Sequence, residues 1–324
     1  MSAVMQISRF NELKNQVLEG KVLTKEEILS LQNEDVDELA EAADEIRQQL
    51  AGNDFDLCTI INGKCGKCSE DCRYCAQSVH FNTNIKEHGF LPIDVIVKRA
   101  VANYEKGANR FSIVCSGKRL TKQQVDYVAA AYKEIRKACN IGLCGSLGLL
   151  DQEDFNKLKE AGLSRFHNNL ETSRNFFPHI CTTHTYDDKI ATLKAAQKAE
   201  VGICSGGIIG MGETMEDRID MAITLRELGA TSVPINVLNP IKGTPLENQP
   251  KLPYDEVRKT VALFRFTLPA AQIRLAGGRS VLEDGGAKTF KGGANAAITG
   301  DLLTTDGPNI DNDVKNIEQM GYDL

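Results

Sequence analysis

The sequence predicts an α/β fold, a (βα)8 barrel of the TIM type with a helical extension before it and a short helical tail after it. Three observations support this prediction. The chain has 324 residues, of which 42% are hydrophobic and 25% charged, which suits one large globular domain. Short β-rich runs alternate with amphipathic helix patterns in eight successive units. Residues of types that commonly bind ligands or take part in catalysis gather where those runs end.

The predicted barrel occupies residues 53–310, between an N-terminal helical extension over residues 1–52 and a C-terminal tail helix over residues 311–324. In residues 8–50 apolar residues recur at helical spacing among charged ones, and Gly20 and Gly52 are typical helix stops. The eight strand candidates that follow are 57–62, 110–115, 141–146, 165–169, 201–206, 232–238, 272–276 and 295–299.

Amphipathic helix patterns fill the segments between these strands. Several of them start at a residue whose short side chain can accept a hydrogen bond from a free backbone N–H group, and such residues cap helices. The expected caps are Asp94, Thr121, Asp151, Thr214 and Asp255.

Charge and hydropathy exclude several classes of partner. The formal net charge is −6, which favours neither nucleic acid nor an anionic membrane surface. The N-terminus lacks the apolar core of a signal peptide, and no stretch approaches the roughly 18 apolar residues of a spanning helix. We therefore expect a cytoplasmic protein. Its ten cysteines then indicate metal or redox chemistry rather than a disulfide framework.

The loop after the first predicted strand contains Cys68, Cys72 and Cys75 in a CxxxCxxC pattern. Three thiolates on a four-iron cluster leave one iron without a protein ligand, and that iron can bind a substrate. A zinc site with Cys65 as fourth ligand and a CxxC redox pair are the alternatives. A cluster that only carries electrons would also need a fourth cysteine. Because the triplet accounts for the pattern, Cys65 is interpreted as a spare loop thiol.

Other residues of chemical interest lie at or near the C-terminal ends of the predicted strands, where barrels of this kind carry their active sites. They are Cys115, Cys144, Asn168, Asn169, Glu171, Cys204, Asn236 and Arg274.

The CxxxCxxC motif, with the aromatic Tyr74 before its last cysteine, resembles the radical S-adenosylmethionine superfamily. Six strings narrow the resemblance to the biotin synthase family: YCAQS, HNNLETS, CSGGIIGMGET, SVPINVLNPIKGTPL, IRLAGGR and GANAAITGDLLTT. The resemblance implies that a 4Fe-4S cluster donates an electron to S-adenosylmethionine. The resulting 5'-deoxyadenosyl radical then removes hydrogen from a substrate.

The resemblance assigns a role to each matching residue. The cluster ligands are Cys68, Cys72 and Cys75. The cofactor contacts are Tyr74 near the adenine, Asn169 and Glu171 at the ribose, His184 near the carboxylate, and the turn that includes Ile208, Gly210, Gly212 and Glu213. Two of these residues depart from the family pattern, since Glu171 stands where the family has Asp and His184 where it usually has Arg. An imidazole is a weaker anion partner than a guanidinium.

Two assignments leave alternatives open. Asn169 and Asn236 match residues of the substrate pocket, but an amide satisfied by neighbouring strands explains Asn236 equally well. A plain glycine turn is the alternative for residues 208–213.

The resemblance also implies an auxiliary iron-sulfur cluster inside the barrel, which serves as the sulfur source. Cys144, Cys204 and Arg274 match three of its ligands, while Ser112 stands where a cysteine is expected. A hydroxyl replaces a thiolate poorly, because it is far less acidic. We therefore expect at least one of Cys115 and Cys181 to join Cys144 and Cys204, in a cluster larger than 2Fe-2S.

The role of Arg274 at the auxiliary cluster has two interpretations. Arg274 is then a charged neighbour of the cluster, or alternatively a barrel arginine paired with a carboxylate. If neither Cys115 nor Cys181 contributes, Ser112 and Arg274 complete a two-iron site. Cys58 and Cys139 are expected to be structural.

The sequence thus predicts an enzyme that inserts sulfur into dethiobiotin to form biotin. The alternative is another barrel-type radical enzyme, either a hydrogenase-cofactor maturase or a methylornithine-forming mutase, and cysteines inside strands three and five argue for sulfur insertion. The expected partners are dethiobiotin, S-adenosylmethionine and a flavodoxin or ferredoxin electron donor, and the expected assembly is a homodimer.

Overall fold

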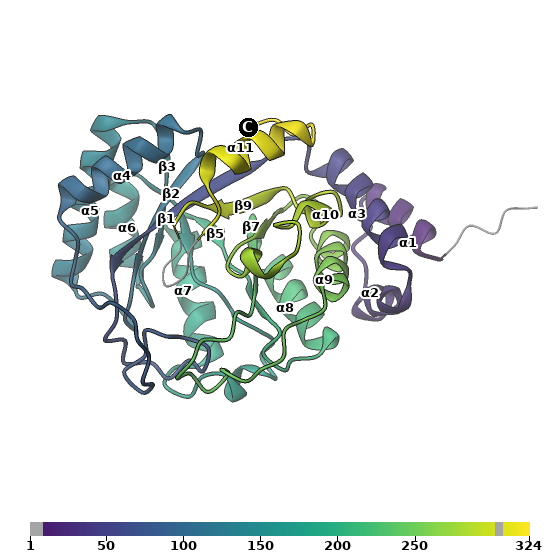
Figure 1. The fold of residues 1–324 in the computed structure, drawn as a ribbon, viewed down its shortest axis with the longest axis horizontal. Coiled ribbons are helices and arrows are strands. Elements are labelled where there is room, and N and C mark those ends of the chain that lie inside the picture. The colour runs from purple at the N-terminus through teal and green to yellow at the C-terminus, as the bar shows by residue number, and fades with distance from the viewer. Residues whose placement is uncertain (1–8, 302–306) are drawn as a thin grey trace, which may run out of the picture.

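The structure is a computed structural model that describes residues 9–301 and 307–324. At its centre, nine parallel strands form one sheet (Figure 1). They are β1 (Asp56–Lys64), β2 (Arg110–Cys115), β3 (Gly142–Ser146), β4 (Leu163–His167), β5 (Gly202–Cys204), β6 (Gly207–Ile209), β7 (Ser232–Val237), β8 (Gln272–Leu275) and β9 (Ala296–Thr299).

The sheet closes on itself. Its strand order is β5-β4-β3-β2-β1-β9-β8-β7-β6, and β5 also pairs with β7, where Cys204 lies opposite Ser232. Because β5 and β6 both pair with β7, they share one position in the ring. The described residues therefore form a closed barrel with eight strand positions, which confirms the predicted fold class.

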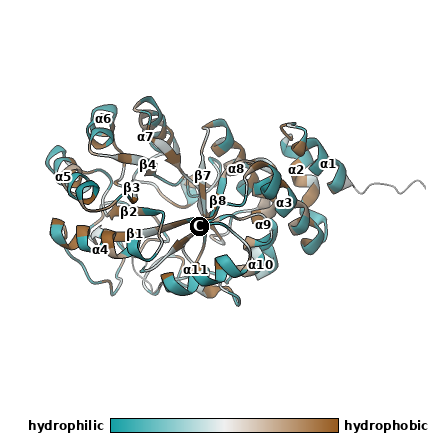
Figure 2. Ribbon diagram, turned by 90° about the horizontal axis from the view of Figure 1, so that it is seen from above, coloured by the Kyte–Doolittle hydropathy of each residue, from teal (hydrophilic) through white to brown (hydrophobic). Residues whose placement is uncertain are grey.

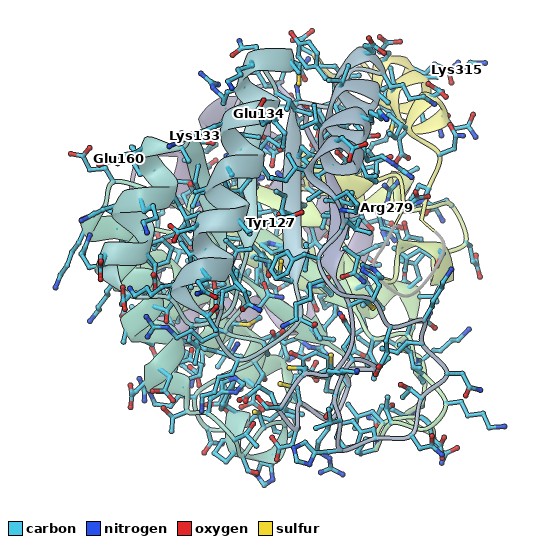
Figure 3. All side chains as sticks on the ribbon, turned by 90° about the vertical axis from the view of Figure 1, so that its left-hand side faces the viewer. Tyr127, Lys133, Glu134, Glu160, Arg279 and Lys315 are labelled. Atoms are coloured by element: carbon cyan, nitrogen blue, oxygen red, sulfur yellow. The ribbon has the colours of Figure 1, made fainter. Side chains whose placement is uncertain are left out.

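Helices surround the barrel, as Figure 2 shows from above. They are α1 (Arg9–Leu18), α2 (Lys25–Ser30), α3 (Val36–Leu50), α4 (Ile93–Glu105), α5 (Lys122–Ala138), α6 (Gln152–Glu160), α7 (Tyr186–Lys198), α8 (Met215–Glu227), α9 (Tyr254–Thr267), α10 (Ala287–Phe290) and α11 (Ile310–Gln319). Each described helix is too short or too polar to span a lipid bilayer. Lys133, Glu134 and Glu160 are exposed charged residues of α5 and α6 in Figure 3.

Three of the five expected helix caps are confirmed. Thr121, Asp151 and Thr214 each accept a hydrogen bond from the third helical residue, which bonds back to form a capping box. The predictions for Asp94 and Asp255 are wrong, because α4 and α9 begin after Pro92 and Pro253. Both aspartates lie instead in the first helical turn, where a negative charge opposes the positive end of the helix dipole.

The N-terminal helices pack on the outside of the barrel. Leu39 and Ile46 of α3 share an apolar cluster with Leu263 and Phe266 of α9. At the other end of the chain, the carboxylate of Asp313 in α11 binds Arg279 through two contacts of 2.9 Å. Of the predicted extension, residues 1–8 lie outside the described residues, as do residues 302–305 of the string GANAAITGDLLTT.

Two strands differ from their predicted bounds. Strand four ends at His167 rather than at residue 169, because its partner β5 ends at Cys204, opposite His167. Glu171, whose φ is +72°, forms a separate bridge with Gly207. The fifth predicted strand ends at Cys204, and the chain returns to the sheet as β6. An ideal Cβ on Gly206 would lie 1.9 Å from the carbonyl oxygen of Pro234, so the backbones touch at this interruption.

Candidate active site

Two neighbouring cavities occupy the C-terminal side of the barrel. The loop cavity, of about 230 Å³, is lined by Cys68, Cys72 and Cys75 together with Asn169, Glu171 and His184. The barrel cavity, of about 260 Å³, lies among the strands and is lined by residues that include Cys58, Cys144 and Cys204. Ser146 and His167 line both cavities, so these two side chains form the boundary between them.

The three cysteines of the motif reach the loop cavity from one compact loop. The Cys68 N–H group donates to the Gln77 carbonyl at 3.0 Å, and the Cys75 N–H group donates to the Cys72 carbonyl at 2.9 Å. All three side chains are only half-buried, whereas Cys58, Cys144 and Cys204 are buried. Burial raises the pKa of Cys75 to about 11.

Residues after β4 form the opposite wall of the loop cavity. Asn169 accepts a hydrogen bond from the Gly206 N–H group at 3.1 Å, and its amide donates to Glu171 at 3.3 Å. The left-handed backbone of Glu171 is unusual for a residue with a side chain, and such strain is common at functional sites. Tyr74 lies in an apolar cluster with Ile180 and Met211, and burial, together with the charge of Glu171, raises its pKa.

The turn over residues 208–213 is stabilised by hydrogen bonds to one of its own side chains, Glu213. Both carboxylate oxygens of Glu213 are engaged, one by the Gly210 N–H group at 2.8 Å and the other by the Met211 N–H group at 2.7 Å. Arg218 donates to the same carboxylate at 2.7 Å. Gly210 and Gly212 have φ angles of +97° and +106°. The structure therefore places Glu213 as a residue that shapes the turn, while Ile208 packs against the same apolar cluster as Tyr74.

Asn236 fits both of its interpretations at once. Its amide donates to the Gly207 carbonyl at 2.9 Å and accepts from the Gly277 N–H group at 2.8 Å. The same side chain lines the barrel cavity. Its hydrogen bonds hold β7 to the adjacent chain segments.

Strand alternation decides which thiols face the barrel cavity. Successive side chains of a strand point to opposite faces, so Ser112 and Val114 of β2 line the cavity and Cys115 does not. On β1 the cavity-lining side chains are Cys58 and Ile60. Cys58, which was expected to be structural, therefore lines the barrel cavity.

Cys115 and Cys181, of which at least one was expected to join Cys144 and Cys204, do not line the barrel cavity. Cys115 packs in the apolar layer between the strands and the outer helices, where burial raises its pKa to about 12, and it reaches only the loop cavity. Cys181 lies on the loop between β4 and α7, in contact with Cys72. The third thiol beside Cys144 and Cys204 is Cys58.

Positive charge is in excess beside the barrel cavity, which Arg165 and Arg274 line. Asp56 is the carboxylate that binds three guanidinium groups there, from Arg274 at 2.5 Å, Arg110 at 2.9 Å and Arg165 at 3.5 Å. Arg274 is thus the buried arginine of an ion pair and lines the cavity as well. A hydrogen bond from Cys58 and the charges of Arg110 and Arg165 lower the pKa of Cys144 to about 6.

Two residues of the site were not singled out from the sequence. His167 bonds to Ser146 at 3.2 Å and to Asn169 at 2.9 Å, and burial lowers its pKa to about 4, which keeps the ring neutral near pH 7. Lys189 is buried in the wall of the loop cavity, 3.9 Å from Glu171 and 3.4 Å from Asn168. The sequence signal for His167 was its place two residues before Asn169. For Lys189 we find no such signal, since it lies among the charged residues of a helix.

Two family models match the chain. The Radical SAM superfamily matches residues 64–225, and the Biotin and Thiamin Synthesis associated domain matches residues 234–323. A curated biotin synthase from Clostridium botulinum is 56% identical over 318 residues, which cover 98% of this chain and 100% of the relative. The chain belongs to the biotin synthase family. Another member, from Brachyspira hyodysenteriae, is 52% identical over 97% of this chain and 94% of its own length.

Membership in the biotin synthase family makes this chain a radical S-adenosylmethionine enzyme. Two solved structures have the same fold at low identity. Methylornithine synthase has a TM-score of 0.84 at 19% identity, with 96% of both chains covered. The hydrogenase maturase HydG of Carboxydothermus hydrogenoformans has a TM-score of 0.81 at 17% identity, with 97% of this chain and 78% of that chain covered. These two comparisons support the barrel, not the reaction.

Proposed function

We propose that this enzyme converts dethiobiotin to biotin, with the first cluster and S-adenosylmethionine at the loop cavity and the sulfur source in the barrel cavity. The observation that carries this proposal is the contact between two thiol-lined cavities through Ser146 and His167. A substrate at that boundary would lie between the place where hydrogen is removed and the place where sulfur is held.

The residues of the loop cavity fit a 4Fe-4S cluster. Cys68, Cys72 and Cys75 lie on one loop at the cavity, half-buried and free of disulfides, so their sulfurs are accessible to iron. When bound, this cluster with S-adenosylmethionine supplies the radical that removes hydrogen from the substrate. Three side chains that can carry charge line the same cavity: Lys189, His184 and Glu171.

We propose that Lys189 binds the carboxylate of S-adenosylmethionine. His184 stands where the family usually has Arg, and an imidazole binds this carboxylate more weakly than a guanidinium. The buried ammonium group of Lys189 has three donors, yet its nearest oxygen partners lie at 3.4 Å and 3.9 Å. Such long contacts leave it able to bind a further anion. His184 is held by Glu70 at 2.6 Å and assists as a second, weaker partner.

The residues of the barrel cavity fit an anionic auxiliary cluster held by Cys58, Cys144 and Cys204. The charge supports this, since Asp56 offsets only one of its three arginines. Arg165 Nη1 is buried and forms no hydrogen bond among the described residues, and its contact with Asp56 is a long ion pair of 3.5 Å. An anionic group in the cavity would provide a hydrogen-bond partner for it. When bound, such a cluster supplies the sulfur atom of the product.

The protein's own side chains would hold the substrate at the boundary. Asn169 is fixed by His167 and Gly206, and Asn236 by two backbone groups, so both amides are preorganised. The neutral ring of His167 separates the cavities without adding a charge beside the radical chemistry. Neither a maturase nor a mutase is favoured by any residue of the site.

The test is biotin formation by the anaerobically reconstituted full chain with dethiobiotin, S-adenosylmethionine and either dithionite or a flavodoxin system. We expect about two 5'-deoxyadenosines per biotin, because two C–H bonds are broken and each needs one radical. The proposal fails if dethiobiotin neither binds nor stimulates cleavage of S-adenosylmethionine.

The electron donor, the assembly and the compartment remain predictions. They are a flavodoxin or ferredoxin, a homodimer and the cytoplasm.

A further inference from the structure

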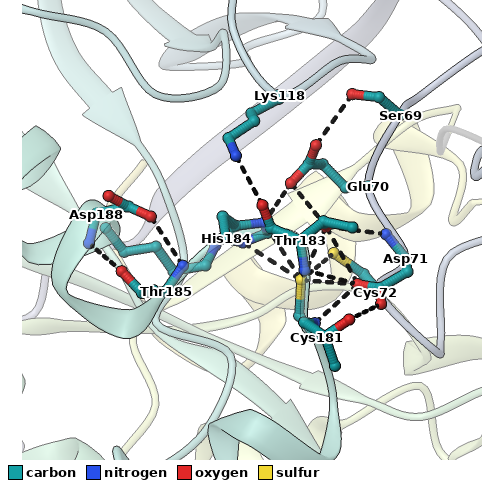
Figure 4. Close-up of polar contacts among 12 residues, drawn as sticks. Ser69, Glu70, Asp71, Cys72, Lys118, Cys181, Thr183, His184, Thr185 and Asp188 are labelled. Atoms are coloured by element: carbon teal, nitrogen blue, oxygen red, sulfur yellow. Dashed lines mark hydrogen bonds and ion pairs between the residues drawn. The ribbon is translucent and has the colours of Figure 1, made fainter.

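The loop that carries Cys181 is tied to the loop that carries the cluster cysteines (Figure 4). The carboxylate of Asp71 accepts hydrogen bonds from the N–H groups of Thr182 at 2.8 Å and Thr183 at 3.2 Å, and from the Cys181 thiol at 3.2 Å. These bonds place the Cys181 sulfur 3.7 Å from the Cys72 sulfur.

His184 completes a group of three donors. Its two ring nitrogens, Nδ1 and Nε2, lie 3.2 Å and 3.8 Å from the Cys181 sulfur. One donor atom from each of Cys72, Cys181 and His184 lies within 4.8 Å of the other two, and Cys181 and His184 are buried. Glu70 binds Nδ1 at 2.6 Å, which leaves Nε2 as the nitrogen available to a metal.

Two of the three separations match the ligand spacing of a tetrahedral zinc site, and the third is within 4.8 Å. With Zn–S bonds of about 2.3 Å and Zn–N bonds of about 2.0–2.1 Å, neighbouring tetrahedral ligands lie about 3.5–3.8 Å apart. The observed 3.7 Å between the sulfurs and 3.8 Å between sulfur and Nε2 are of that size. A carboxylate on the far nitrogen of a ligating histidine, as Glu70 provides, is the usual support of such a ligand.

We propose that Cys72, Cys181 and His184 form a mononuclear site for Zn²⁺ in the cluster-free chain. Two thiolates and an imidazole favour Zn²⁺ over Mg²⁺ or Ca²⁺, which prefer oxygen ligands. On binding, each thiol loses its proton to solvent, and the oxidation state of the metal does not change. Solvent or the neighbouring Asp71 carboxylate fills the fourth position.

The site excludes the first cluster, because both need the Cys72 thiolate. A cluster iron takes one terminal thiolate, so Cys181, in contact with Cys72, is not placed to ligate a second iron. Zinc at this site therefore competes with cluster assembly. This consequence rests on the proposed function, whereas the zinc site itself does not.

The first experiment isolates the site in the full-length, cluster-free chain under anaerobic conditions. A Cys68→Ser/Cys75→Ser double variant removes the two other motif thiols, and Co²⁺ serves as the spectroscopic probe. We expect one Co²⁺ per chain, with tetrahedral d–d absorption and thiolate charge-transfer bands that Zn²⁺ abolishes.

Further substitutions on this background identify the ligands. Cys181→Ser and His184→Ala should remove most of the affinity, and Glu70→Gln should weaken it about 10- to 100-fold, as expected for a ligand's hydrogen-bond partner. Cys65→Ser and Cys139→Ser are matched thiol controls that should change nothing. The zinc site is refuted if the double variant binds no Co²⁺, or if Cys181→Ser and His184→Ala bind it as tightly as their parent.

The second experiment measures competition by following formation of the first cluster at increasing Zn²⁺ concentration, from its absorption and iron content. The unsubstituted chain should need less Zn²⁺ for half-inhibition than Cys181→Ser. Equal sensitivity of the two proteins would refute the competition. Neither experiment uses dethiobiotin, so failure of the proposed reaction would be seen separately.

Discussion

The loop cavity and the barrel cavity both gather three thiols, but they do so by different means. The loop cavity takes Cys68, Cys72 and Cys75 from one short loop, where chain connectivity already keeps them close. The barrel cavity takes Cys58, Cys144 and Cys204 from β1, β3 and β5, which are far apart in sequence. A contiguous motif therefore predicts the first site, whereas only the closure of the barrel assembles the second.

The largest expected effect is on the loop cavity. Replacing Cys72 by Ala should abolish formation of 5'-deoxyadenosine, because it removes one of the three motif thiolates that hold the first cluster. The measurement is 5'-deoxyadenosine by chromatography, with dithionite as reductant. Cys139→Ser, at a half-buried thiol outside both cavities, is the control and should retain activity. Normal 5'-deoxyadenosine formation by Cys72→Ala would show that the loop cavity does not hold the first cluster.

The next effect distinguishes the cavities from each other. Cys58→Ala should lose the auxiliary iron and biotin formation but keep the first cluster and the cleavage of S-adenosylmethionine. Iron and sulfide analysis with Mössbauer spectroscopy measures both clusters. Cys115→Ser is the matched control, since its side chain faces away from the barrel cavity and the auxiliary iron should remain. If Cys115→Ser lost the auxiliary iron and Cys58→Ala kept it, strand alternation would not decide which thiols bind the auxiliary cluster.

A smaller effect is expected for Lys189, in the wall of the loop cavity. Lys189→Met should weaken binding of S-adenosylmethionine about 10- to 100-fold, because a hydrogen bond to a charged group contributes about 1.5–3 kcal/mol. Equilibrium binding to the protein with its first cluster measures this directly. Lys189→Arg should restore part of the affinity. If Lys189 merely balances the charge of Glu171, the Met variant will bind the cofactor normally.

The smallest effect is expected for Ser112 in the barrel cavity. Ser112→Ala should leave the auxiliary iron content unchanged, because three thiols already line the cavity and a hydroxyl is a poor iron ligand. Iron analysis tests this. Loss of auxiliary iron in this variant would instead support the two-iron site completed by Ser112 and Arg274.

Part of the prediction succeeded because its signals are local. Eight βα units, the helical extension and three capping boxes follow from hydrophobic periodicity and from side chains that bond to their own helix ends. The caps at Asp94 and Asp255 failed because a nearby proline competed for the helix start. Strand four ended early because its pairing with β5 stops at Cys204, and the end of a partner strand leaves no signal in the sequence of β4 itself.

The sequence by itself determined the barrel and the three cysteines of the motif, since both depend on spacing along the chain. Only the tertiary structure decided that Cys58 joins Cys144 and Cys204, that Cys115 faces away, and that Cys181 lies against Cys72. It also placed Lys189 beside Glu171 and His167 between the cavities. The physical reason is that the direction of a side chain depends on the exact register and end of its strand. A shift of one residue moves a thiol from the inside of the barrel to the outside.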